Sequence, residues 1–96
     1  YKLALRIIGK FNKAGGIKYN KVIIKSHKTK WGSCSKKGNL NFNYRIVFLP
    51  RCLAEYIVVH ELCHLKELSH GRRYWNLVEK ILPNYKKLIH ELKSNY

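Results

Sequence analysis

The segment from 51 to 68 constrains the fold most, because it is predicted to be a helix that is apolar on nearly every side. Its large apolar residues are Leu53, Ile57, Val58, Val59, Leu62 and Leu65. Pro50 precedes the segment, and proline suits the first turn of a helix, where its missing N–H is not needed. A helix without a wide polar face must be covered on more than one side, so we expect it at the centre of the domain.

This helix carries two histidines one turn apart, in the motif His60-Glu61-Leu62-Cys63-His64. Residues four apart lie on one face of an α-helix, about 6 Å apart along its axis, so both imidazoles face one ion. Glu61 is rotated by about 100° from His60, which places it off the metal but near a bound water. Coincidence gives only about 0.013 such motifs in a chain of this composition. Buried polar groups on an apolar helix are also costly unless they bind something.

A third metal ligand must come from outside this helical face, and His70 fits best. It follows His64 by six residues. In a continuous helix it would lie about 15 Å beyond His60 along the axis, out of reach of the same ion. We therefore expect the helix to end near Ser69, where Ser69 and Gly71 favour a turn.

Glu67 is the alternative third ligand, because it follows His64 by three residues on the same face and a carboxylate there can share the metal. His27 and His90 fit less well, since one belongs to a basic strand region and the other to the tail. The chain has no Asp. A carboxylate that orients the ligand imidazoles must therefore be a Glu, such as Glu79, unless backbone carbonyls do this.

Three protein ligands predict a catalytic site with one zinc ion, because the fourth position stays open for water. The metal would lower the pKa of that water and polarise the oxygen of the substrate. Glu61 would take the proton of the water during attack and return it to the leaving group. The motif therefore predicts a zinc-dependent hydrolase.

Three further helices are predicted around the central one. Apolar spacing favours helices over 3 to 13, 71 to 82 and 85 to 92. The first would end at the Gly15-Gly16 pair and the second at Pro83. The last helix is short and basic, and we expect it to fray or to dock on the sheet.

Short strands are predicted at 22–24, within 28–35 and over 40–49, with a turn at 37–39. We expect them to form a small antiparallel sheet of about three strands. The fold class is thus α+β, with the sheet packed on the central helix. At 96 residues the chain is one domain, since smaller domains struggle to bury enough surface.

The chain is strongly basic, with 20 Lys and Arg against 5 Glu and a net charge of +15. The first acidic residue is Glu55. Such an excess attracts acidic partners, here nucleic acid or a nucleotide, by steering and counterion release. Lysines dispersed over a solvated surface explain the charge equally well.

Cysteine use and hydropathy indicate the compartment. The three cysteines form no C-x-x-C pair, which argues against a disulfide framework and favours a reducing cytoplasm. No apolar run approaches the ~20 residues that cross a bilayer, so no membrane partner is expected. The sequence has no Met and begins with Tyr1, so we expect it to be the C-terminal part of a longer protein.

Further motifs follow in order along the chain: Thr29–Ser35 (TKWGSCS), Gly38–Asn43 (GNLNFN), Tyr56–Leu65 (YIVVHELCHL), and His70 with Arg73-Tyr74-Trp75. In this order they resemble the YgjP-like metallopeptidase-type family, which is related to the minimal zincins of the SprT and WLM groups. The resemblance implies metal ligation by His60, His64 and His70. It also implies that Glu61 is the catalytic base and that the edge strand of a short sheet lines the cleft.

The sequence departs from the YgjP-like pattern in two respects. Cys63 stands where the YgjP-like proteins usually have Ala, and we expect it to pack as a small buried apolar residue. The β-rich N-terminal portion typical of the family is absent. The histidine spacing also matches the metzincin run, but Glu67 occupies the place of its turn-forming Gly.

Five side chains are candidates for contact with the substrate: Ser33, Cys34, Arg45, Arg73 and Tyr74. The side chains of Ser33 and Cys34 would face the cleft. Those of Arg45, Arg73 and Tyr74 would stabilise an oxyanion. Tyr74 also has the helical spacing of a core residue. We expect Trp31 to lie in the core and to be followed by a tight turn at Gly32.

A peptidase is the favoured function, with an extended peptide or protein substrate added to the sheet edge. The resemblance also allows metal-dependent hydrolysis of a nucleotide phosphoanhydride, although the chain has no P-loop. The third hypothesis is a basic nucleic-acid-binding module with structural zinc. It requires a fourth protein ligand, such as Cys34 or Glu67, in place of water.

Overall fold

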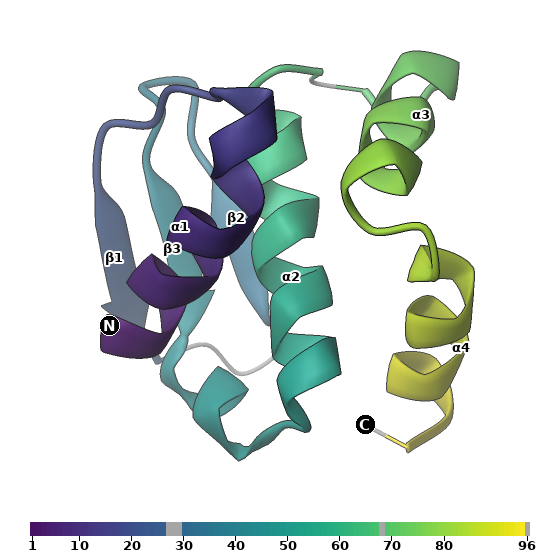
Figure 1. Cartoon of the computed structure of the whole chain (residues 1–96). Coiled ribbons are helices and arrows are strands. Elements are labelled where there is room, and N and C mark those ends of the chain that lie inside the picture. The colour runs from purple at the N-terminus through teal and green to yellow at the C-terminus, as the bar shows by residue number, and fades with distance from the viewer. Residues whose placement is uncertain (27–29, 68, 96) are drawn as a thin grey trace.

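The computed structural model describes residues 1–26, 30–67 and 69–95, without the side chains of 13–15. Four α-helices, three strands and one 3-10 helix follow in the order α1 (Lys2–Gly15), β1 (Val22–Lys25), β2 (Gly32–Cys34), β3 (Leu40–Asn43), η1 (Tyr44–Phe48), α2 (Arg51–His64), α3 (Arg72–Ile81) and α4 (Tyr85–Asn95). The predicted α+β class is confirmed (Figure 1). No helix in these described stretches is long and apolar enough to cross a membrane.

The sheet has three strands in the order β1-β3-β2 and is mixed. β2 runs antiparallel to β3, whereas β1 runs parallel to β3 with Val22 opposite Leu40. The prediction of an antiparallel sheet is therefore wrong for the β1–β3 pair. The prediction fails because of the strand order: β2 lies at the edge beyond β3 and not between β1 and β3, so β1 and β3 are neighbours. Periodicity within a strand carries no information about which neighbour that strand pairs with.

Strand β3 is the middle strand of the sheet and is buried on both faces. Leu40 and Phe42 are completely buried on one face of the sheet, and Asn41 and Asn43 are buried on the other. The strand is shorter than predicted, because it ends at Asn43, which caps the following 3-10 helix η1. Its side-chain carbonyl accepts a hydrogen bond from the Arg45 N–H, and its amide donates to the Lys30 carbonyl.

Helix α2 is the centre of the domain, as predicted. It contacts α1, β2, β3, α3 and α4, and Figure 1 shows it between the sheet with α1 on one side and α3 with α4 on the other. Leu53, Val58, Val59, Leu62 and Cys63 are fully buried along it. Burial of Cys63 confirms that it packs as an apolar residue, and burial raises the pKa of its thiol to about 12.

The central helix is shorter than the predicted span to residue 68, because α2 ends at His64. The Leu65 N–H bonds to the Leu62 carbonyl, and the Lys66 N–H bonds to the Cys63 carbonyl. These i to i−3 bonds tighten the last turn and satisfy carbonyls that the helix leaves unpaired. The chain consequently leaves the helix axis well before His70.

The flanking helices cover α2 from two sides. Helix α1 ends as predicted at the glycine pair, with Gly16 in the left-handed conformation at φ 56°. Helix α4 extends to Asn95, so it is longer than predicted. Its main contacts are with α2, because Leu88 is buried and Tyr85 stacks on Trp75 of α3.

Candidate metal centre and active-site cleft

Three histidines from two parts of the chain meet at the C-terminal end of α2. The ligating nitrogens of His60, His64 and His70 all lie within 4.8 Å of one another. The ring centroids of His64 and His70 are 4.4 Å apart, and those of His60 and His70 are 5.2 Å apart. The structure therefore brings together the three ligands that the sequence predicts.

The alternative ligands lie elsewhere or outside the described residues. Glu67 lines a shallow surface groove with Arg73 and is not among the described residues that cluster at the centre. His90 is exposed on α4. His27 lies outside the described residues.

His60 is held on both sides by tyrosine hydroxyl groups. The Tyr56 hydroxyl lies 3.1 Å from Nδ1 of His60, and the Tyr74 hydroxyl donates to the His60 carbonyl at 2.9 Å. When Nδ1 carries the proton and donates to Tyr56, Nε2 keeps its lone pair for a metal. Burial, with smaller contributions from His64 and His70, lowers the pKa of His60 to about 4. A metal requires this neutral imidazole.

Tyr56 is the partner of the His60 ring that sequence analysis missed. The sequence offered a Glu such as Glu79, or else backbone carbonyls, for this role, but Glu79 is exposed on α3. Tyr56 precedes His60 by four residues, so both side chains lie on one helical face, and that spacing is the signal for the pair. Burial, followed by the charges of Glu61 and Tyr85, raises the pKa of Tyr56 to about 12, so its hydroxyl stays protonated.

Tyr74 is completely buried beneath the cluster. Its ring stacks on that of His64, with centroids 4.5 Å apart and planes at 29°. Burial raises the pKa of its hydroxyl well above the ordinary range. The Tyr74 hydroxyl is directed at the helix backbone, where it holds the turn that contains His60.

The other predicted contact residues are dispersed. Gly32 and Cys34 alternate with Ser33 along β2, so Ser33 points to the opposite face of the sheet. Cys34 lies on the same face of β2 as Gly32, the face that approaches Glu61. Burial, followed by the charge of Glu61, raises the pKa of the Cys34 thiol. Arg45 is exposed on η1, 5.9 Å from the Tyr44 ring. Arg73, also exposed, lines the groove described above.

Gly32 lets the sheet approach Glu61 closely. A Cβ atom at this position would lie 3.1 Å from Cγ of Glu61 and 3.0 Å from the Asn41 carbonyl oxygen. Gly32 is the first residue of β2 and has no positive φ, so the predicted tight turn here is wrong. Glycine favours this close approach because a side chain here would crowd the Glu61 arm and the Asn41 backbone.

Glu61 is a buried carboxyl group, 8% exposed. Burial raises its pKa to about 7, and the nearby positive charge of Lys30 opposes the shift. A carboxylate poised near neutral pH suits a general base.

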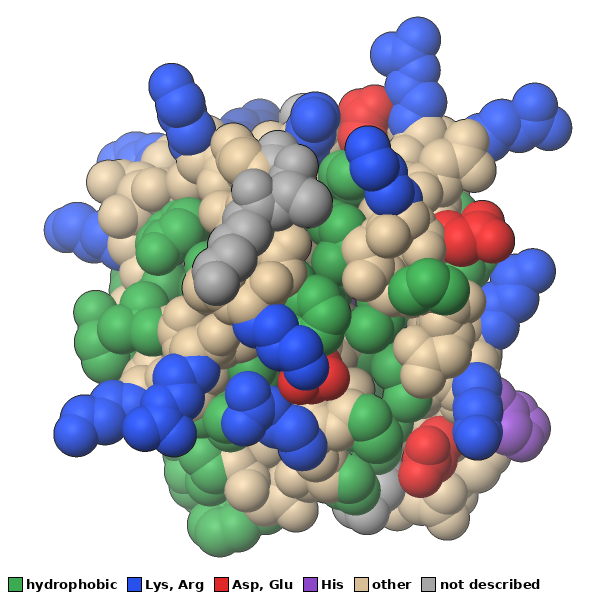
Figure 2. Space-filling view, viewed as in Figure 1, with side chains coloured by type: hydrophobic (Ala, Val, Ile, Leu, Met, Phe, Trp, Pro, Cys, Tyr) green, Lys and Arg blue, Asp and Glu red, His purple; other side chains and the backbone are tan. Residues whose placement is uncertain are grey.

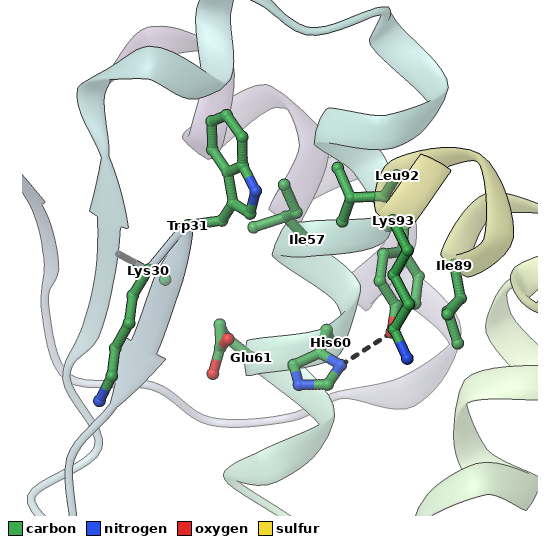
Figure 3. Close-up of a pocket in the computed structure, with 10 residues that line it drawn as sticks. Lys30, Trp31, Ile57, His60, Glu61, Ile89, Leu92 and Lys93 are labelled. Atoms are coloured by element: carbon green, nitrogen blue, oxygen red, sulfur yellow. Dashed lines mark hydrogen bonds between the residues drawn. The ribbon is translucent and has the colours of Figure 1, made fainter. Parts of the chain in front are cut away.

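A cavity of about 260 Å³ opens beside Glu61 and His60. Figure 3 shows Lys30 and Trp31 on the side of β2, Ile89, Leu92 and Lys93 of α4 on the opposite side, and α2 between them. Trp31 was expected in the core. It is only partly buried, and it packs on the edge of the core while lining this cavity.

Comparison with known proteins agrees with the geometry. A family model described as YgjP-like, metallopeptidase domain matches residues 3–95, a wider stretch than the motifs span. No curated protein matches the sequence.

Two crystal structures share the fold. The metallopeptidase zymogen of Pyrococcus abyssi abylysin is 24% identical with a TM-score of 0.84, over 95% of this chain and 92% of that one. The metallopeptidase zymogen of Methanocaldococcus jannaschii jannalysin is 23% identical with a TM-score of 0.70, over 97% and 86%. At these identities the likeness establishes the fold.

Replacing Gly32 by Ala should destabilise the domain by about 1–3 kcal/mol, because the new methyl group meets a backbone oxygen and the Glu61 side chain. The free energy of unfolding in urea measures the effect. Gly9→Ala is the matched control, since a Cβ at Gly9 on α1 meets nothing within 4 Å. Equal stability of both variants would show that β2 can accommodate a side chain at position 32 beside Glu61.

Replacing Tyr56 by Phe should lower zinc affinity by about 10-fold, because His60 loses the partner that orients its ring. Competition for zinc with a chelator of known affinity measures the change. Tyr19→Phe is the control, since Tyr19 is 38% exposed in the segment before β1. An unchanged affinity in Tyr56→Phe would remove Tyr56 from the centre.

Proposed function

Because the chain belongs to the YgjP-like metallopeptidase family, we propose that it hydrolyses peptide bonds with one zinc ion held by His60, His64 and His70. The observation that carries the proposal is the meeting of these three imidazoles beside the buried carboxyl group of Glu61. Glu61 acts as the general base.

The donor set fits zinc. A tetrahedral ion about 2.1 Å from each nitrogen needs nitrogens about 3.4 Å apart, close enough to the observed limit of 4.8 Å for small side-chain rotations to cover the difference. His60 is neutral at physiological pH, as a ligand must be. The cluster of described residues has three members, the number typical of catalytic zinc. When bound, the ion supplies Lewis acidity and promotes ionisation of water.

The carboxyl group of Glu61 moves the protons of the reaction. Its ionised form accepts a proton from the attacking water, and its protonated form returns that proton to the leaving amine. Burial balances the two forms near neutral pH, and Lys30 favours the ionised one. Gly32 keeps β2 against this side chain, which limits its movement.

The free edge of β2 is the proposed site for the substrate backbone. β2 pairs with β3 along one edge, and along the other it pairs with no strand of the described chain. An extended peptide would add to this edge through main-chain hydrogen bonds. Because β2 also contacts α2, a peptide bound there passes close to Glu61.

The basic surface does not by itself favour the alternative functions. Lys and Arg side chains project from most parts of the face seen in Figure 2, with acidic side chains scattered among them. A dispersed arrangement is typical of a solvated surface, whereas a nucleic-acid site concentrates its charge in one patch or stripe. The charge would still attract acidic protein substrates.

Glu61→Gln should retain zinc and lose at least about 100-fold in peptide hydrolysis, because the amide cannot accept the proton of the attacking water. Metal analysis and cleavage of an unstructured protein such as casein measure the two properties. Glu79→Gln is the matched control, since Glu79 is exposed on α3. Hydrolysis that survives Glu61→Gln would contradict the proposed base.

His70→Ala should bind zinc much more weakly than the unsubstituted chain, because only the two ligands on α2 remain. Glu67→Ala should bind zinc normally, since Glu67 lines a separate groove. Equilibrium dialysis against zinc compares the two, with His90→Ala as a control for loss of an exposed histidine. Loss of zinc in Glu67→Ala but not in His70→Ala would exchange their roles.

A further inference from the structure

The cavity beside Glu61 is large enough to hold a side chain of another molecule. Its interior is apolar, formed by Trp31, Ile57, Ile89 and Leu92. At about 260 Å³ it is larger than the ~150 Å³ cavity that accommodates benzene in another protein. An aromatic ring or a branched aliphatic group therefore fits within it.

The position of the cavity ties it to the reacting groups. His60 and Glu61 belong to its lining, so a substrate side chain inside it would lie close to both groups. Figure 3 shows Ile57 one turn before these two residues on α2, with α4 forming the opposite wall. A substrate group held in this pocket would therefore be selected at the place where selectivity affects catalysis most directly.

Two lysines stand on opposite sides of the cavity. Lys30 lies on the side of β2 and Lys93 on α4 (Figure 3). Both are exposed, whereas the acidic residue among the described residues that line the cavity is the buried Glu61. The mouth of the pocket is therefore cationic, and it attracts a negative group on the substrate.

We infer that this cavity selects peptides with a large apolar residue next to the scissile bond and a carboxylate close to that residue. The apolar side chain enters between Trp31 and Leu92, and the carboxylate faces Lys30 and Lys93. The carboxylate is that of an Asp or Glu side chain or that of the peptide C-terminus. The inference rests on the proposed peptidase function and names its substrate class.

A set of fluorogenic peptides of equal length tests this with the zinc-loaded chain. The peptides carry Phe or Gly beside the scissile bond, Glu or Lys as its neighbour, and a free or amidated C-terminus. We expect kcat/KM to be at least about 10-fold higher for Phe than for Gly. Glu should exceed Lys by about 2- to 5-fold at low salt, and the difference should shrink in high salt.

The C-terminal arm separates the two sources of the carboxylate. If amidation lowers kcat/KM whether or not the peptide contains Glu, the recognised group is the terminal carboxylate. If kcat/KM depends on Glu alone, the recognised group is the Glu side chain. Equal rates throughout the set overturn the inference. If Glu61→Gln is then inactive on the same peptides, the proposed function stands without it.

Lys93→Glu and Lys87→Glu provide a matched pair, because both lysines are exposed on α4 and Lys87 does not line the cavity. Lys93→Glu should reverse the preference for Glu over Lys in the peptide. Lys87→Glu should leave it unchanged. Equal effects of the two substitutions would assign the preference to net charge and overturn the role of the pocket.

Leu92→Trp and Ser94→Trp test the apolar interior in the same way. Leu92→Trp fills the cavity, so the preference for Phe over Gly should disappear. Ser94, which is exposed on α4, should tolerate Trp without a change in selectivity. Leu92→Ala serves where Leu92→Trp does not fold, and it should weaken the preference for Phe. An undiminished preference in the Leu92 variants overturns the inference.

Binding to zinc-loaded Glu61→Gln provides a readout independent of turnover. Calorimetry should show tighter binding of the Phe–Glu peptide than of the Gly–Lys peptide. Selective binding without hydrolysis by the unsubstituted chain would retain the pocket and reject the proposed function. Unselective binding would reject the pocket.

Discussion

The need to place polar groups on a buried helix is the constraint on which the rest of this structure depends. Helix α2 is surrounded by other elements, yet it carries His60, Glu61 and His64 in one turn. Burial shifts the pKa of His60 down and that of Glu61 up, so both charged forms are disfavoured. Such groups are stable in a core only when hydrogen bonds or a bound ion compensate for their lost hydration.

The surrounding elements meet that requirement by direct contact. Tyr56 bonds to the ring of His60, and Tyr74 bonds to its backbone and stacks under His64. Gly32 removes the side chain that would separate β2 from Glu61. These residues come from α2, α3 and the sheet, so the geometry of the centre depends on the packing of the whole domain. A disturbance in α2, in α3 or in the sheet would therefore change the positions of the reacting groups.

The same packing produces the cleft. Helix α4 lies against α2 because Leu88 is buried and Tyr85 stacks on Trp75. This leaves Ile89 and Leu92 facing Trp31 across the cavity. Burial of one side of α4 thus forms the core, and the neighbouring side forms the wall of the proposed specificity pocket. Stability and selectivity are coupled through one short helix.

Local patterns in the sequence were sufficient for the features that a single helix contains. The i, i+4 spacing of the histidines, the intervening Glu61 and the all-round apolar character of α2 fix which groups share a turn, because helix geometry relates them directly. The alternation of β3 and the glycine pair after α1 indicated their elements for the same local reason. Tyr56 could also have been found from its spacing to His60.

Only the tertiary structure decided how separate segments meet. The sequence favoured His70 over Glu67 as the third member of the centre, and the structure brings His70 there because α2 ends at His64. Gly32 matters because β2 lies against Glu61, and β1 pairs with β3 in parallel because β2 occupies the edge. Each of these outcomes depends on distances between segments far apart in the chain. Those distances are set by the collective burial of apolar side chains, which no local periodicity encodes.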